Sequence, residues 1–162
     1  MIVSQRISKH LFQLMGEYVF ISMDELVGLE FEHYANLNAV EGEIRFSYLK
    51  GKQEENKEKG YVYLWLEMNK KDDVFRVVYV GKAGRTMRER CSQHQSGFRG
   101  TSKSPAALKN AANIQAGVTC GATFHVYARK SGAMVLFGER VSMHSLEEEA
   151  LIKKLSPAWN KI

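Results

Sequence analysis

The chain has 162 residues and a formal net charge of +5, and this length suits one domain with an apolar core of its own. Its two cysteines, Cys91 and Cys120, form neither a CxxC motif nor a zinc-ligand spacing. No apolar run has transmembrane length or a signal-peptide pattern. These features exclude a zinc finger, and we expect a reduced, cytoplasmic setting away from membranes.

The charge is distributed unevenly along the chain. Residues 1–60 hold 7 Lys/Arg and 10 Asp/Glu, a net −3, whereas residues 61–162 hold 16 and 8, a net +8. The interval between Glu89 and Glu139 has no carboxylate and contains Arg90, Arg99, Lys103, Lys109, Arg129 and Lys130. A positively charged surface attracts polyanions, so we expect this interval to bind a nucleic-acid phosphate backbone. The alternative is that these charges face solvent and bind no ligand.

The first part of the chain is predicted to be an extension of a core that begins at residue 60. Apolar residues recur at helical spacing over residues 3–15, and residues 17–21 can form a short strand. Ser22 followed by Glu25 predicts a short helix over residues 23–27. Residues 28–48 show no clear pattern, and residues 50–60 are a polar, charged connector. We therefore expect a single domain, with an extension over residues 1–59 and a core over residues 60–162.

Two strands are predicted at the start of the core. Residues 61–68 and 74–81 are rich in Val, Tyr, Leu and Phe, and the polar NKKDD segment between them predicts a β-hairpin. Because side chains alternate along a strand, Tyr61, Tyr63 and Trp65 should share the more solvated face, and the aliphatic residues between them should face a core.

A helix is predicted after this hairpin. Thr86 and Glu89 have capping-box spacing, and Met87, Arg90, Cys91 and His94 then fall on one side of the helix.

A second helix is predicted from Ser104 and Pro105 through Ala116, ending at Gly117. Its polar side chains suit phosphates or base edges, although helices of this composition also serve as packing elements. Residues 123–128 and 134–137 predict a second hairpin across the KSGA segment, and the two hairpins can form one antiparallel sheet.

The last predicted helix covers residues 146–155, with Ser145 as its cap and Pro157 beyond its end. Glu148 lies on the apolar side of this helix, whereas Glu147 and Glu149 have lysines seven and four residues further on. Two explanations remain for Glu148. It can bond locally with Ser145 in a capping box, or it can hold a hard divalent cation together with water and substrate phosphate.

These residues resemble a known family. Tyr61-Val62-Tyr63 and Tyr79-Val80-Gly81 resemble the paired tripeptides of the GIY-YIG nucleases, and the match spans roughly residues 60–160. LIKKLSPAWN resembles the end of the nuclease module in the bacterial excision-repair C subunit, as does Lys82 after YVG. Arg90, His94, Glu148 and Asn160 follow in the family's order. Tyr61 replaces the first glycine of the motif, the hairpin connection is longer and Arg90 lies about one residue further from YVG. The tyrosine at the first motif position and the extra elements around the core are more similar to the small type II restriction enzymes of the superfamily.

The resemblance implies an α+β fold, a small antiparallel sheet flanked by helices, and Mg²⁺-dependent hydrolysis of DNA, with Mn²⁺ as a substitute. Glu148 would be the metal ligand, Arg90 and Lys82 would contact phosphate, and either Tyr63 or His94 would be the final proton acceptor. The implied catalytic set is Tyr63, Tyr79, Lys82, Arg90, His94, Glu148 and Asn160. The expected DNA-binding set is Arg88, Arg99, Lys103, Lys109, Asn110, Asn113 and Gln115.

Three functions remain open on the sequence. The first is a sequence-specific type II restriction enzyme that acts on double-stranded DNA as a homodimer or higher oligomer. The second is a phage, repair or mobile-element nuclease of looser specificity, and the third is a catalytically inactive nucleic-acid-binding module.

Each site residue also has a structural explanation: Arg90 could pair with Glu139, His94 could be a core histidine, and Asn160 could fix the chain end. His10, His33, His125 and His144 form no comparable set and are expected to be structural.

Overall fold

The computed structural model describes residues 19–49, 51, 59–69, 74–101 and 104–160. The helix expected over residues 3–15, most of the 50–60 connector and Lys103 lie outside these residues. Within them, no helix has the length and apolar character needed to cross a membrane.

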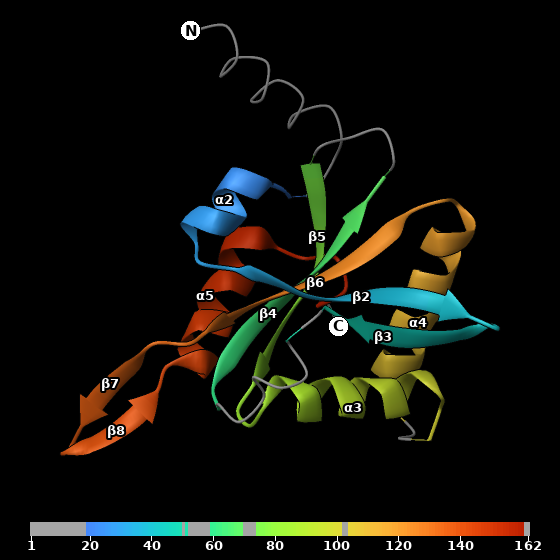
Figure 1. Cartoon of the computed structure of the whole chain (residues 1–162). Helices are drawn as coiled ribbons and strands as arrows, with labels where there is room; N and C mark the ends of the chain where they lie inside the picture. Colours follow the sequence, from blue (N-terminus) through green and yellow to red (C-terminus); the bar gives the residue numbers. More distant parts are fainter. Residues whose placement is uncertain (1–18, 50, 52–58, 70–73, 102–103, 161–162) are drawn as a thin grey trace, which may run out of the picture.

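Six strands form one antiparallel sheet, in the order β1-β5-β4-β6-β2-β3 (Figure 1). The expected α+β class with a small antiparallel sheet flanked by helices is confirmed. The strands are β1 (Phe20–Ser22), β2 (Glu32–Val40), β3 (Glu43–Tyr48), β4 (Tyr61–Met68), β5 (Val74–Ala83) and β6 (Thr123–Lys130).

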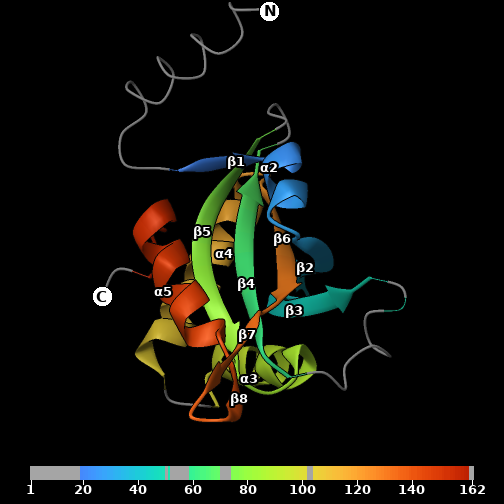
Figure 2. The same cartoon turned by 90° about the vertical axis from the view of Figure 1, so that its left-hand side faces the viewer.

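Helices cover both faces of this sheet (Figures 1 and 2). The helices α3 (Met87–Phe98) and α4 (Pro105–Thr119) pack on one face, and α2 (Met23–Gly28) and α5 (His144–Leu155) pack on the other. A separate two-stranded sheet, β7 (Ala133–Leu136) with β8 (Glu139–Ser142), projects from the body of the molecule.

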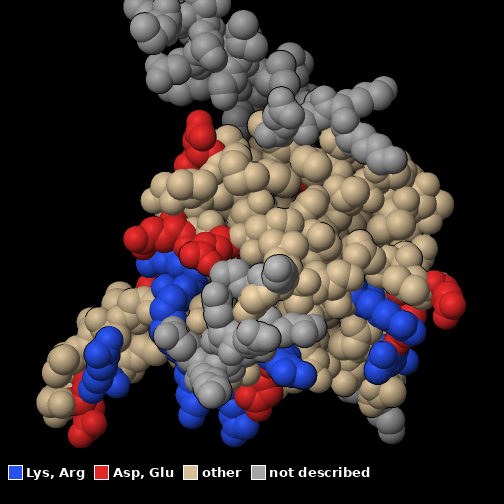
Figure 3. Space-filling view, viewed as in Figure 1, with Lys and Arg blue, Asp and Glu red and all other residues tan. Residues whose placement is uncertain are grey.

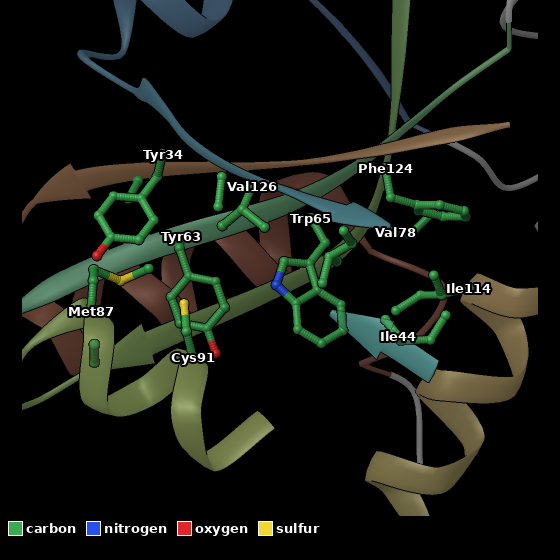
Figure 4. Close-up of a cluster of buried hydrophobic side chains, with 14 of the residues drawn as sticks. Tyr34, Ile44, Tyr63, Trp65, Val78, Met87, Cys91, Ile114, Phe124 and Val126 are labelled. Carbon is green, nitrogen blue, oxygen red and sulfur yellow. The ribbon is translucent and has the colours of Figure 1, made fainter. Parts of the chain in front are cut away.

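The two covered faces give two hydrophobic cores. The core beneath α3 and α4 contains Tyr63, Trp65 and Cys91 (Figure 4), and the opposite core contains the aliphatic residues of β4 and Leu155. Tyr63 has a relative exposure of only 1%. The expectation that its face of β4 is the more solvated one is therefore wrong, because α3 and α4 cover that face.

The local signals for the starts of α2, α3 and α4 are confirmed. Ser22 and Glu25 form a complete capping box at the start of α2, and the Thr86 side chain accepts a hydrogen bond from Glu89 N at the start of α3. Ser104 caps α4, with Pro105 as the first helical residue. Each cap satisfies backbone N–H groups that the first turn of a helix leaves without partners.

Several elements differ from the sequence prediction. Residues 28–48, which showed no clear pattern, contain β2 and β3, and both belong to the same sheet as β4, β5 and β6. Helix α4 continues past Gly117 to Thr119. Strand β7 pairs with β8 instead of β6, so the second hairpin was predicted with the wrong partner strands.

Candidate active site

The Tyr63 ring packs directly over Gly81 of the neighbouring strand. The two residues are direct partners in the β4–β5 pairing, and a Cβ atom at Gly81 would lie 2.3 Å from both Tyr63 Cζ and the Tyr63 hydroxyl oxygen. Real side chains do not tolerate such a contact, so the Tyr63 ring can lie across β5 only because residue 81 has no side chain.

A short chain of hydrogen bonds begins at the Tyr63 hydroxyl. Its oxygen lies 2.6 Å from His94 Nε2 and accepts a bond of 3.1 Å from Arg90 Nε. Arg90 also donates to Gln93 Oε1 at 3.0 Å. Helix α3 thus brings Arg90 and His94, one turn apart, to the same phenol of β4, and Arg90 bonds Tyr63 and Gln93 in place of the Glu139 partner that the sequence left open.

The environment sets the charge of each member of this chain. Burial raises the pKa of Tyr63 well above its usual value, and Tyr79 adds to the rise while Arg90 opposes it. Burial, helped by the Arg90 charge, lowers the pKa of His94 to about 3. Burial also works against the charge of Arg90, but the Tyr63 and Tyr79 hydroxyls outweigh it and raise the Arg90 pKa.

We assign the hydrogen-bond roles near neutral pH from these directions. Arg90 is charged and can only donate, so the Tyr63 oxygen accepts from it and the Tyr63 proton points to His94. His94 is neutral and accepts through Nε2, which places its own proton on Nδ1. The phenol therefore has a ready acceptor for its proton.

Arg90 also lines a pocket of about 400 Å³ beside this chain. Lys82 from the end of β5 and Glu148 from α5 line the same pocket, and Lys82 Nζ lies 2.9 Å from a Glu148 carboxylate oxygen. Three of the predicted catalytic residues therefore converge from three different elements. Tyr63 and His94 lie behind Arg90 and are not among the lining residues.

The start of α5 differs from the prediction and rules out the local partner expected for Glu148. The helix begins at His144 with Met143 as its N-cap and has no side-chain cap bond, so the capping box of Ser145 with Glu148 is wrong. Glu147 accepts hydrogen bonds from Gly132 N at 2.9 Å and from Arg129 at 3.4 Å. This anchor ties the first turn of α5 to the segment between β6 and β7.

The residues of the pocket fit one hard divalent cation. Glu148 offers carboxylate oxygens, and its described ion-pair partner is Lys82, whose side chain is 42% exposed. Among the described residues, no group of three or more His, Cys, Asp or Glu side chains is placed to hold a metal. Mg²⁺ suits such a site because it keeps several waters and needs only one or two protein carboxylates together with substrate phosphate.

His144 is a pocket residue that the sequence reasoning left as structural. It lines the pocket with Glu148, its Nδ1 lies 2.9 Å from Ser142 Oγ, and a Cβ atom at Gly84 would lie 3.2 Å from its Nε2. The sequence feature that could have revealed His144 is its position four residues before Glu148, on the same side of the helix. It was missed because the predicted helix started at residue 146.

Asn160 and Tyr79 support the site without lining the pocket. The Asn160 amide accepts a hydrogen bond from Val80 N and donates one to Val80 O, both at 2.8 Å, so it holds the backbone of β5 next to Gly81. The Tyr79 ring packs 4.6 Å from the Trp65 ring, centroid to centroid, and Tyr79 helps to raise the pKa of Arg90.

The predicted DNA-binding residues are scattered. Arg88 and Lys109 are exposed on α3 and α4, whereas Arg99 is paired with Glu43. Asn110 is 7% exposed and lies inside the protein, so its placement does not suit base reading. Asn113 is half-buried, and Gln115 lines a different groove, with Glu43 and Arg99.

The charged side chains of the face seen in Figure 3 gather toward the end of the molecule where Figure 1 places α3. In the upper half of this view the described surface carries few charges, and those that are seen are acidic.

No protein-family model matches the chain, and no curated protein matches it. Among solved structures, a mutant of bacteriophage T4 EndoII matches with a TM-score of 0.63 and 21% identity, over 85% of this chain and 96% of that chain. Restriction endonuclease HPY188I in complex with product DNA matches with a TM-score of 0.49 and 14% identity, over 83% and 78%. The first likeness shows a common fold over nearly the whole of the phage protein.

Proposed function

We propose that the protein is a DNA endonuclease that hydrolyses phosphodiester bonds with the help of Mg²⁺. The observation that carries this proposal is the convergence of Lys82, Arg90 and Glu148 on one pocket, with the Tyr63–His94 pair bonded directly behind Arg90. The fold shared with T4 EndoII supports it, and so does the order of the GIY-YIG motif residues along the chain.

Two cations of the pocket bind the scissile phosphate in this proposal. Arg90 can present a pair of N–H groups to two nonbridging oxygens, and Lys82 supplies a compact second charge. Lys82 pairs with Glu148 in the free protein, so it moves from carboxylate to phosphate when the substrate and cation arrive. Both contacts compensate the charge that grows on the phosphoryl oxygens.

Tyr63 and His94 relay the proton of the attacking water. The water oxygen forms a bond to phosphorus as the bond from phosphorus to the departing oxygen breaks, while the water proton passes to the Tyr63 oxygen and the Tyr63 proton moves to His94 Nε2. The phenol therefore never has to hold a full negative charge in its buried position. Because burial holds the pKa of His94 at about 3, His94 keeps this proton only for the moment of attack, and the proton then returns through Tyr63 to solvent water.

Glu148, together with water and phosphate oxygens, would hold Mg²⁺, or Mn²⁺ in its place, and the cation would supply charge that polarises the phosphate and the departing oxygen. Asn113, Gln115 and the exposed Lys109 are the remaining candidates of α4 for contacts to DNA. A restriction-type enzyme that reads a short site is the form of the activity we favour.

The direct test is digestion of a supercoiled plasmid by the purified protein with Mg²⁺, comparing wild type with Glu148→Ala and Glu149→Ala. Glu149 is a matched control because it is exposed on the same helix and pairs with Lys153 at 2.7 Å. We expect Glu148→Ala to abolish nicking and cleavage, and Glu149→Ala to match wild type. DNA binding without added metal should stay the same or tighten in Glu148→Ala, because Lys82 loses its carboxylate partner.

Equal activity in Glu148→Ala and wild type would refute the metal site. Salt-sensitive binding to DNA without cleavage under any divalent cation would refute the endonuclease and leave the nucleic-acid-binding module in its place. Glu147→Ala is unsuitable as a control, because Glu147 anchors α5 through Gly132 and Arg129.

A further inference from the structure

The β7–β8 hairpin exposes an apolar surface that nothing in the described chain covers. It forms its own two-stranded sheet and projects away from the body (Figures 1 and 2). Met134, Leu136 and Val141 share one of its faces with Glu139 and are 36–44% exposed, Val135 on the other face is 70% exposed, and Phe137 at the tip is fully exposed. An isolated two-stranded hairpin is at best marginally stable in water, so this arm gains by being covered.

The turn at the tip carries an unfavourable residue. Phe137 and Gly138 have φ values of +52° and +84°, the pattern of a two-residue turn that strongly prefers Asn-Gly or Asp-Gly. The β2–β3 turn has the same geometry at Glu41 and Gly42, with φ values of +51° and +79°, and uses a polar residue there. A phenylalanine at the tip therefore weakens the free hairpin on two counts, backbone conformation and exposure.

The edges and charges of the hairpin indicate what covers it. Strand β7 has no charged residue and no proline, whereas β8 carries Glu139 and Arg140, so β7 is the edge without protection against pairing with another strand. The hairpin has one charge of each sign (Figure 3 shows an arm that is otherwise uncharged). A net charge of zero gives no attraction for a polyanion or an anionic membrane, but it suits a copy of the same arm.

We propose that the hairpin is a self-association arm, in which β7 of one copy pairs antiparallel with β7 of a second copy and the exposed apolar residues pack across the two-fold axis. Such an interface is isologous, because each copy gives the same surface. The two hairpins then make a four-stranded sheet with a hydrophobic face, and Phe137 of each copy is removed from water.

The hairpin joins the body of the protein beside the pocket. Pairing of two hairpins would therefore also fix the pockets of the two copies relative to each other. Ser142, the last residue of β8, holds the His144 ring, and Gly132, just before β7, is held by Glu147. Both contacts lead into the first turn of the helix that carries Glu148. The association itself does not depend on the proposed endonuclease activity and is measured without DNA or metal.

The test compares the molar mass of wild type, Phe137→Asn and Val27→Ser by sedimentation equilibrium over a wide range of protein concentration. Val27 is a matched control because it is an exposed apolar residue, 66% exposed, on α2. Wild type and Val27→Ser should reach the mass of two chains. Phe137→Asn should raise the dissociation constant at least ~10-fold, the scale of removing an aromatic anchor.

Phe137→Asn also keeps the test independent of folding. Asn-Gly is the preferred sequence for this turn, so the variant should unfold at the same or a higher temperature than the wild-type monomer while it associates more weakly. A wild type with the mass of one chain at all concentrations overturns the proposal, and so does a Phe137→Asn protein that dimerises as tightly as wild type. If the same substitution instead weakens DNA binding by a monomer, the arm is a DNA contact.

Discussion

Arg90 both bonds the Tyr63 hydroxyl and faces the pocket. Its Nε–H fixes the Tyr63 hydroxyl at 3.1 Å, while the same residue lines the pocket where a phosphate would bind. The two tyrosine hydroxyls raise its pKa despite burial, so the charge is present at every physiological pH. In the proposed reaction, the same residue therefore orients the proton relay and contacts the substrate.

We expect Arg90→Ala to lower the rate of plasmid cleavage by at least ~10², the scale of removing one transition-state charge contact. Arg45→Ala is the control, since Arg45 is exposed on β3 and paired with Glu43. Initial rates at saturating Mg²⁺ provide the measurement, and circular dichroism checks the fold. A wild-type rate in Arg90→Ala would return this residue to a purely structural role.

At the scale of elements, the site depends on how closely β4 and β5 approach each other. The motif glycine has no turn to make, because Gly81 lies inside β5 and its φ is not positive. Its role is to leave room for the Tyr63 ring across the strand pair. Asn160 holds the same stretch of β5 through Val80 from its other edge.

Gly81→Ala should therefore remove activity without touching a reacting group. The new methyl would overlap Tyr63 Cζ and its hydroxyl oxygen, so the ring must move away from Arg90 and His94, at a cost of about 1–3 kcal/mol in unfolding free energy. Gly28→Ala is the matched control, because a Cβ atom at Gly28 meets nothing within 4 Å. Denaturant unfolding and plasmid cleavage give the two measurements, and full activity in Gly81→Ala would contradict this account of the glycine.

At the scale of the whole molecule, the covering of the sheet by helices on both faces makes the stability of the fold sensitive to acid. Helices on both faces bury β4, and His94 lies between Trp65, Phe98 and the Tyr63 ring. A neutral imidazole fits this place and a charged one does not, which is why its pKa falls to about 3 from a usual value of 6.5. The fold thus resists protonation of one specific residue.

The sign of the resulting pH dependence is fixed. Below pH 6.5 the unfolded chain protonates this histidine while the folded protein does not until about pH 3, so acid favours unfolding. The free energy of unfolding should fall by up to about 1.4 kcal/mol per pH unit below 6.5, from this residue alone. Urea unfolding of wild type and His94→Gln between pH 7 and about 4.5 measures it, a window above most carboxylate titration. An equally steep slope in His94→Gln would show that other groups cause the acid sensitivity.

The sequence by itself determined the parts that depend on residues a few positions apart. The starts of α2, α3 and α4 follow from Ser22, Thr86 and Ser104, because a cap bonds to an N–H only three residues on. The strands β4 and β5 follow from composition and alternation. The order of motif residues was also enough to bring Tyr63, Arg90 and His94 together in prediction, as the structure does.

Only the tertiary structure decided the features that join distant segments. Strands β2 and β3 have no strong local pattern, and they form because β2 pairs with β6 about ninety residues later. Whether the Tyr63 face is wet or dry depends on α3 and α4, and the direction of Glu148 depends on where α5 meets Gly132 and Lys82. Pairing and packing between segments far apart in the chain set these outcomes, because their free energy comes from partners that no local window of sequence contains.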